Sequence, residues 1–150
     1  MVTVLLVRHA DIDLPPGSTD PPLNSDGQTR ARALAHVAGS AEVSAIFTST
    51  FTRTKQTAKP LADRLGLQPQ EVPQPEHPDV LAQQILSGQF GAVVLIAGHS
   101  DTVPKMINAL GTAAEPAISE REFDNLFVVT VLRRGEAALV RLRYGANSDS

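Results

Sequence analysis

The sequence predicts a three-layer α/β/α domain, in which a mostly parallel sheet with an antiparallel edge lies between two layers of helices. Apolar runs at 2–7 and 92–97 are typical of strands buried on both faces. Segments with helical spacing alternate with such runs, and two final apolar runs flank a tight turn. The length of 150 residues and a hydrophobic content of 42% fit one domain over 1–150.

The first half of the chain is expected to alternate strands and helices, with boundaries at Gly, Pro, Ser and Asp residues. Pro60 lies within the second predicted helix and has no backbone N–H, so we expect it to kink or split that helix. The expected elements are a strand over 2–7, a loop over 10–24, a helix from Asn24 or Ser25 to Gly39, a strand over 45–48 and a helix from about Phe51 to Gly66.

The second half is expected to continue the alternation and to end in a hairpin. That hairpin accounts for the antiparallel edge, because two strands joined by a tight turn run in opposite directions. The expected elements are an extended crossover over 69–78 with four prolines, a helix over 80–86, a strand over 92–97, a helix over about 102–110, and strands over 127–132 and 138–142 around Arg134-Gly135.

Composition excludes several classes of function. A formal net charge of −3 argues against nucleic-acid or anionic-membrane binding, which needs a basic face. The apolar runs are too short to span a bilayer and no charged segment precedes the first one, so we expect a cytoplasmic protein without a membrane partner. The absence of cysteine excludes a disulfide framework, a thiolate nucleophile and a cysteine-type zinc site.

Three short strings place arginines and histidines at the ends of predicted strands. Arg8-His9 follows the first strand, residues 49–58 (STFTRTKQTA) follow the strand over 45–48, and Gly98-His99-Ser100 follows the strand over 92–97. Ligands of such sheets bind at the carboxyl ends of the strands. The two histidines are therefore expected to meet in one crevice.

These strings resemble the signatures of the histidine phosphatase superfamily, whose best-known member is phosphoglycerate mutase. The resemblance covers nearly the whole chain and implies a phosphoglycerate mutase-like fold. Ala10 departs from the glycine that is usual in the family, and its Cβ restricts the backbone beside His9. The matching residues are Val7-Arg8-His9-Ala10, Leu23-Asn24-x-x-Gly27-Gln28, Ser49-x-x-x-Arg53-Thr54-x-Gln56-Thr57-Ala58 and Gly98-His99-Ser100.

The side chains in these strings suit phosphoryl transfer. Arg8 and Arg53 can bind phosphate oxygens in a bidentate way while they stay charged. The resemblance implies that His9 is the nucleophile, and that His99 is a further donor to phosphate that carries a proton when phosphate is bound. All four residues are thus expected in one phosphate pocket. No metal and no cofactor are expected, because two histidines flanked by arginines form a poor cation site.

The proton donor to the leaving group has several candidates. In the mutase-like branch of the family it is a glutamate after the second signature, and Glu76 or Glu71 lies in that region. In the acid-phosphatase branch an aspartate directly follows the second histidine, whereas Ser100 intervenes here before Asp101. Asp101 is better explained as a helix N-cap, because capping by Asp101 or Thr102 places Pro104 in the first helical turn. A mechanism with no acid is the remaining alternative.

The short chain leaves little room for the inserted segments that retain a substrate in a mutase. We therefore expect a phosphatase that hydrolyses phosphomonoesters or phosphoramidates through phospho-His9, most similar to the small SixA-type phosphohistidine phosphatases. Its substrate would be a small phosphorylated metabolite or a phosphoprotein. The alternatives are a phosphoglycerate mutase-type phosphotransferase and a non-catalytic phospholigand-binding protein. No motif specifies the natural substrate or the oligomeric state.

Overall fold

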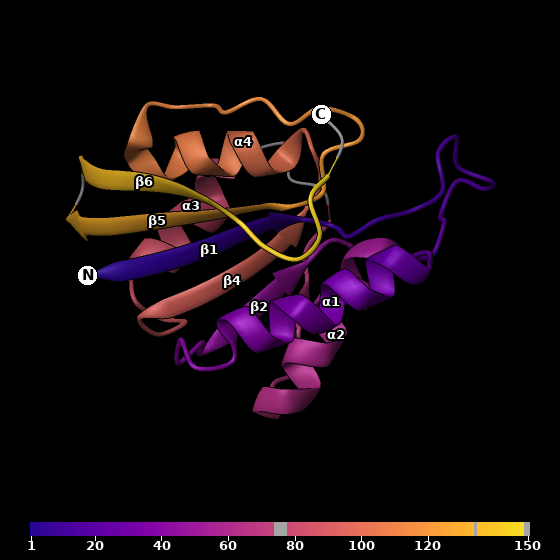
Figure 1. The fold of residues 1–150 in the computed structure, drawn as a ribbon. Coiled ribbons are helices and arrows are strands. Elements are labelled where there is room, and N and C mark those ends of the chain that lie inside the picture. Colours follow the sequence, from indigo (N-terminus) through magenta and orange to yellow (C-terminus); the bar gives the residue numbers. More distant parts are fainter. Residues whose placement is uncertain (74–77, 134, 149–150) are drawn as a thin grey trace.

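A computed structural model describes residues 1–73, 78–133 and 135–148. A six-stranded sheet forms the middle layer, with helices α1 and α2 on one face and helices α3 and α4 on the other (Figure 1). This arrangement confirms the predicted α/β sandwich. No helix in the described parts of the chain is long and apolar enough to cross a membrane.

The sheet has the order β3-β2-β4-β1-β5-β6. Strands β1 to β4 are parallel to one another, whereas β5 is antiparallel to both β1 and β6. The predicted antiparallel edge is therefore confirmed. The strands are β1 (Val2–Arg8), β2 (Ala45–Thr48), β3 (Gln70–Glu71), β4 (Val93–Gly98), β5 (Asn125–Arg133) and β6 (Glu136–Arg143).

Strand β3 was not expected, because the proline-rich segment over 69–78 predicts an extended crossover without pairing. Two residues of that segment nevertheless pair with β2, in the register Phe47↔Gln70 and Thr48↔Glu71. The prolines lie outside the pair, so neither paired residue lacks a backbone donor. A two-residue strand is too short to leave a periodic pattern in the sequence.

The helices follow the predicted order. The Asn24 side chain caps α1 by accepting from the Gly27 N–H at 2.9 Å, and Gly66 ends α2 in the left-handed conformation at φ 67°. The predicted split at Pro60 is wrong, because α2 is continuous. The carbonyl that Pro60 leaves without a donor belongs to Gln56, an exposed residue that water can reach. The helices are α1 (Ser25–Ala38), α2 (Thr52–Leu65), α3 (Pro78–Leu86) and α4 (Thr102–Ile107), which continues into η1 (Asn108–Thr112).

Two apolar clusters hold the layers together. One packs Leu6, Phe127 and neighbouring sheet residues against α3, α4 and η1, and the other packs Leu5, Leu95 and their neighbours against α1 and α2. Because β1 and β4 are central and parallel, their carboxyl ends lie side by side, with Arg8 paired to Gly98. This register brings the first and third strings to one edge of the sheet.

Candidate active site

His9 follows β1 and is almost fully buried, with 3% of its surface exposed. Its Nδ1 lies 2.8 Å from the carbonyl oxygen of Ala10. Because a carbonyl can only accept, Nδ1 must carry the proton, and Nε2 keeps its lone pair. Burial, and then the charges of Arg8 and Arg53, lower the pKa of His9 to about 3. The ring is thus neutral near pH 7, with Nε2 available as a nucleophile.

Arg8 is held by the segment that precedes β5. Its Nη1 donates to the backbone carbonyls of Ser119, Glu120 and Glu122 at 3.2, 2.8 and 3.0 Å. The guanidinium carbon lies 4.2 Å from the ring centre of Phe123. Burial lowers the pKa of Arg8 to about 10, which leaves the group charged. Its Nε is buried and has no hydrogen-bond partner among the described residues, so this donor is available to an anion.

Arg53 approaches the same place from the first turn of α2. Its guanidinium carbon lies 4.5 Å from the ring centre of Phe51, and its buried Nη1 has no hydrogen-bond partner in the part of the chain that the structure describes. Asp20 Oδ1 lies 3.9 Å from that nitrogen, beyond hydrogen-bond range. The Asp20 carboxylate instead accepts from Thr52, from its N–H at 2.9 Å and from its hydroxyl at 2.7 Å. Asp20 thereby ties the loop over 10–24 to the start of α2.

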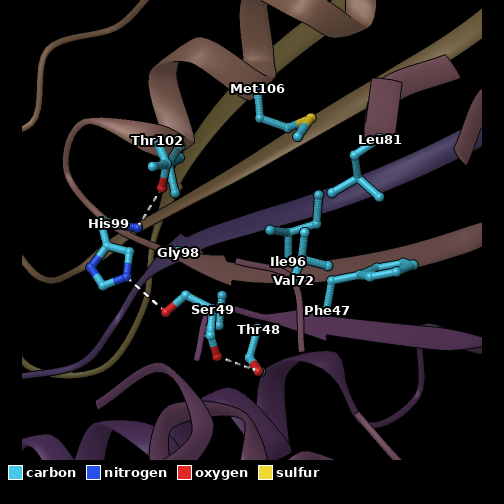
Figure 2. A pocket seen from close by; sticks show the side chains of 12 residues that line it. Phe47, Thr48, Ser49, Val72, Leu81, Ile96, Gly98, His99, Thr102 and Met106 are labelled. Atoms are coloured by element: carbon cyan, nitrogen blue, oxygen red, sulfur yellow. Dashed lines mark hydrogen bonds between the residues drawn. The ribbon is translucent and has the colours of Figure 1, made fainter. Parts of the chain in front are cut away.

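His99 is oriented by the buried hydroxyls of Ser49 and Thr54, and Figure 2 shows the contact between its ring and Ser49. The Thr54 hydroxyl donates to the carbonyls of Phe51 and Ser49 at 3.0 and 3.2 Å. Because this uses the single hydroxyl proton of Thr54, Thr54 Oγ1 accepts from Ser49 Oγ at 2.8 Å. The Ser49 proton is then used as well, so Ser49 Oγ accepts from His99 Nε2, also at 2.8 Å. The backbone N–H of His99 donates to Thr102 Oγ1 at 3.0 Å. This order of donors leaves Nδ1 as the free ring nitrogen of His99.

The two imidazole rings are close neighbours, with centroids 5.5 Å apart. Burial, followed by the charge of Arg53, lowers the pKa of His99 to about 4. Together with Arg8 and Arg53, the two histidines line a cavity of about 430 Å³. The structure thus brings the four predicted pocket residues together. Two buried arginine N–H groups without partners indicate that the cavity suits an anion.

The comparisons with known proteins fit this geometry. The model of the histidine phosphatase superfamily (branch 1) matches residues 4–74, which hold the first two strings. Over these residues the chain is similar to the histidine phosphatase superfamily. The match confirms the resemblance that the sequence shows in this part of the chain. No curated protein matches the chain.

Solved structures share the fold over almost the full chain. The protein histidine phosphatase SixA, complexed with tungstate, is 20% identical with a TM-score of 0.79, over 95% of this chain and 97% of that one. A mycobacterial glucosyl-3-phosphoglycerate phosphatase in complex with inorganic phosphate is 15% identical, with a TM-score of 0.70 over 98% of both chains. YhfR of Bacillus stearothermophilus is 17% identical, with a TM-score of 0.73 over 93% and 95%. At these identities the likeness establishes the fold.

Thr57 and Gln56, both in the string over 49–58, make contacts that hold the loop beside His9. Thr57 Oγ1 accepts from the Ala10 N–H at 2.8 Å, directly beside the predicted nucleophile. Gln56 Oε1 accepts from the Leu23 N–H at 2.8 Å, at the end of the loop over 10–24. These roles were missed, although both residues were noted as part of the motif. Asp20 and the carbonyls around Arg8 were also missed, and no local sequence signal identifies them.

The candidate proton donors lie in different places relative to the cavity. Glu76 lies outside the described residues, and Glu71 is exposed in β3. Asp101 is the N-cap of α4, because its Oδ1 accepts from the Thr102 N–H at 2.9 Å. Its carboxylate also lines the cavity, so capping does not remove it from the site. In the described part of the chain, no group of three or more His, Cys, Asp or Glu side chains could hold a metal ion.

A second and much smaller cavity, of about 40 Å³, shares His99 with the phosphate pocket and has Ser49 in its own wall (Figure 2). Most of its wall is apolar, formed by Phe47, Ile96, Met106 and their neighbours. A phosphate would find few donors there. The cavity of about 430 Å³ is therefore the candidate active site.

Proposed function

We propose that the chain hydrolyses phosphomonoesters or phosphoramidates through a phosphohistidine formed on His9. The observation that carries this proposal is the placement of His9 Nε2, a lone-pair nitrogen in one cavity with buried arginine donors that have no partner. Neutral imidazole is a good nucleophile near neutral pH, and fixed cations stabilise the charge that phosphoryl transfer spreads over three oxygens. The tungstate and phosphate complexes of structural neighbours support an oxyanion at such a site.

The reaction has two displacements. His9 Nε2 attacks phosphorus, a P–N bond forms, and the P–O or P–N bond to the leaving group breaks with its electron pair. Water then attacks the phosphorus, the bond to His9 breaks, and inorganic phosphate leaves. The water loses one proton in this second step, and the leaving group gains one overall, so the sum is simple hydrolysis.

His99 would act on the phosphoryl oxygens through Nδ1. Its pKa is low in the unliganded site because it is buried beside Arg53. A phosphate dianion brings opposite charge, which favours the protonated ring. A proton on Nδ1 then makes His99 a donor to phosphate, while Nε2 keeps its bond to Ser49. Glu76 remains a predicted donor to the leaving group, and Asp101 is the candidate among the described residues that line the cavity.

The test is hydrolysis of para-nitrophenyl phosphate by the wild type and by His9→Ala. We expect kcat to fall by at least about a thousandfold, because removal of a nucleophile disables the whole chemical step. His36→Ala, which changes an exposed histidine of α1, is the matched control and should keep full activity. Undiminished turnover in His9→Ala would contradict the mechanism.

The product separates the remaining alternatives. Inorganic phosphate as the product supports a phosphatase, whereas return of the group to a phosphorylated acceptor identifies a mutase. Binding of phosphate without turnover of any phosphoryl substrate would identify a non-catalytic binding protein. Screening phosphorylated metabolites and phosphohistidine peptides then addresses the natural substrate.

A further inference from the structure

The cavity around His9 is divided by charge. The cationic side chains in its described lining are Arg8 and Arg53, beside His9 and His99. The other charged side chains in that lining are the carboxylates of Asp101 and Glu120, which are exposed. The sequence over 74–77 (QPEH) contains no arginine or lysine either.

The orientation of the arginines decides which end receives the phosphoryl group. Arg8 is 6% exposed. Its buried Nε and the buried Nη1 of Arg53 have no hydrogen-bond partner within residues 1–73, 78–133 and 135–148. These donors, together with His9 Nε2, require the phosphoryl group at the inner end of the cavity. An in-line displacement then places the leaving group opposite His9, toward the rest of the wall.

That remaining wall combines apolar side chains, the hydroxyls of Ser18, Thr19 and Ser100, and two carboxylates. Ile12, Leu14 and Pro21, from the loop over 10–24, form its apolar part. Asp101 comes from the start of α4, and Glu120 comes from the segment whose carbonyls hold Arg8. A leaving group with a carboxylate or a second phosphate would meet these carboxylates without a further cation in the described lining. A neutral or cationic leaving group would meet no such repulsion.

We infer that this phosphatase selects phosphoryl compounds whose leaving group is neutral or cationic and discriminates against anionic leaving groups. The inference rests on the proposed function and deepens it, since it concerns the specificity of the same site. Asp101 and Glu120 are its specificity-determining residues. Phosphorylated sugar acids and bisphosphates are accordingly poor substrates, whereas phosphorylated amines, aminoalcohols and neutral alcohols or imidazoles fit the wall.

The test uses two aryl phosphates of opposite charge, 4-(aminomethyl)phenyl phosphate and 4-carboxyphenyl phosphate. For each enzyme we take the ratio of kcat/KM for the cationic compound to kcat/KM for the anionic one. Comparing this ratio between enzymes cancels the intrinsic reactivity of the two leaving groups, and Glu120→Gln, which alters no candidate proton donor, isolates the effect of charge. The variants are Asp101→Asn, Glu120→Gln and the double variant, all of which keep the side-chain shape.

These substitutions leave the supporting contacts in place. Asparagine caps helices as well as aspartate does, and the Glu120 carbonyl that holds Arg8 belongs to the backbone. The control is Glu115→Gln, which removes an exposed carboxylate from the same connecting segment but lies outside the cavity lining. Circular dichroism and Tm confirm that each variant is folded.

We expect the ratio to fall about tenfold in the double variant. The two carboxylates attract the cationic leaving group and repel the anionic one across water, and both effects are lost when the carboxylates are replaced by amides. Each single variant should give part of this change, and Glu115→Gln none. The wild-type ratio should also shrink in about 1 M salt, because exposed charges are screened. Equal ratios in the wild type and the double variant, with both compounds hydrolysed, would overturn the inference and leave the proposed function standing. Failure of the wild type to hydrolyse either compound would instead overturn the proposed function, and this inference with it.

Discussion

The two ends of the active-site cavity are built differently. The inner end is formed at the carboxyl ends of β1 and β4 and at the start of α2, where Arg8, His9 and His99 are each at most 6% exposed. The outer wall comes largely from the loop over 10–24 and from the start of α4. Buried hydrogen bonds hold the inner end, whereas the outer charges are exposed. The rigid inner end suits the phosphoryl-transfer chemistry, which needs fixed groups, whereas the exposed outer wall suits the selection of the leaving group.

Among substitutions that leave the nucleophile in place, the largest effect should come from one at the inner end that keeps the charge but changes its geometry. Arg53→Lys retains a cation, yet it loses the planar fork that can bind two phosphate oxygens. We expect kcat/KM to fall about a hundredfold, as for loss of a preorganised donor to the transition state. Steady-state kinetics with para-nitrophenyl phosphate measure it, and Arg32→Lys, on the exposed surface of α1, is the control. Equal kinetics for Arg53→Lys and the wild type would show that the fork is not used.

A smaller loss is expected when His99 loses its orienting hydroxyl. Ser49→Ala removes the acceptor of His99 Nε2 and the donor to Thr54. We expect kcat to fall about tenfold, as for loss of a group that orients a functional histidine. Thr54→Ser keeps the hydroxyl chain and should retain most activity. If Ser49→Ala changes the Tm but leaves both kcat and its pH profile unaltered, the chain of hydroxyls is purely structural.

A change in the outer loop should affect binding more than chemistry. Asp20→Ala removes the carboxylate that ties the loop over 10–24 to Thr52. We expect KM to rise roughly threefold with little change in kcat, because the inner end keeps its own contacts. Asp13→Ala, an exposed carboxylate of the same loop, serves as the comparison. A large fall in kcat for Asp20→Ala would show that Asp20 acts mainly by placing Arg53.

The smallest effect concerns stability at low pH. Hydrogen bonds from Arg143 and from the Ser119 N–H hold the pKa of Glu122 at about 2, below its ordinary value of 4.5, although burial opposes the shift. A lowered folded-state pKa stabilises the protein above the ordinary value, and this stability is lost as the pH falls from about 4.5 to 2. Glu122→Gln should therefore flatten the dependence of Tm on pH in that range. Parallel curves for the variant and the wild type would exclude Glu122 as a source of acid sensitivity.

The residues at the inner end of the cavity could be predicted from the sequence, whereas the contacts of the loops could not. Arg8, His9 and His99 were predicted together because they lie at or just after the ends of two strands, β1 and β4, whose apolar runs are clear in the sequence. Parallel pairing then requires that these strand ends meet. Arg53 was predicted from its motif, and the structure places it in the first turn of α2.

The contacts that the connecting loops make with Arg8 and with the start of α2 could not be predicted, because they join residues far apart in the chain. Asp20 meets Thr52, and the carbonyls around Glu120 meet Arg8, through loop conformations that leave no periodic pattern. Strand β3 was missed because two paired residues are too few for a pattern. The split at Pro60 was wrong since a single lost backbone bond on the exposed side of α2 does not break the helix.

The central claim is a covalent phosphohistidine at the inner end of the cavity. The most direct measurement is rapid quenching with a ³²P-labelled aryl phosphate, followed by treatment of the labelled protein with acid or alkali and by mapping of the label. The proposed mechanism predicts an adduct on His9 that is labile in acid and stable in alkali, as phosphoramidates are, and that is absent from His9→Ala. An alkali-labile adduct would indicate an acyl phosphate on a carboxylate and would contradict it.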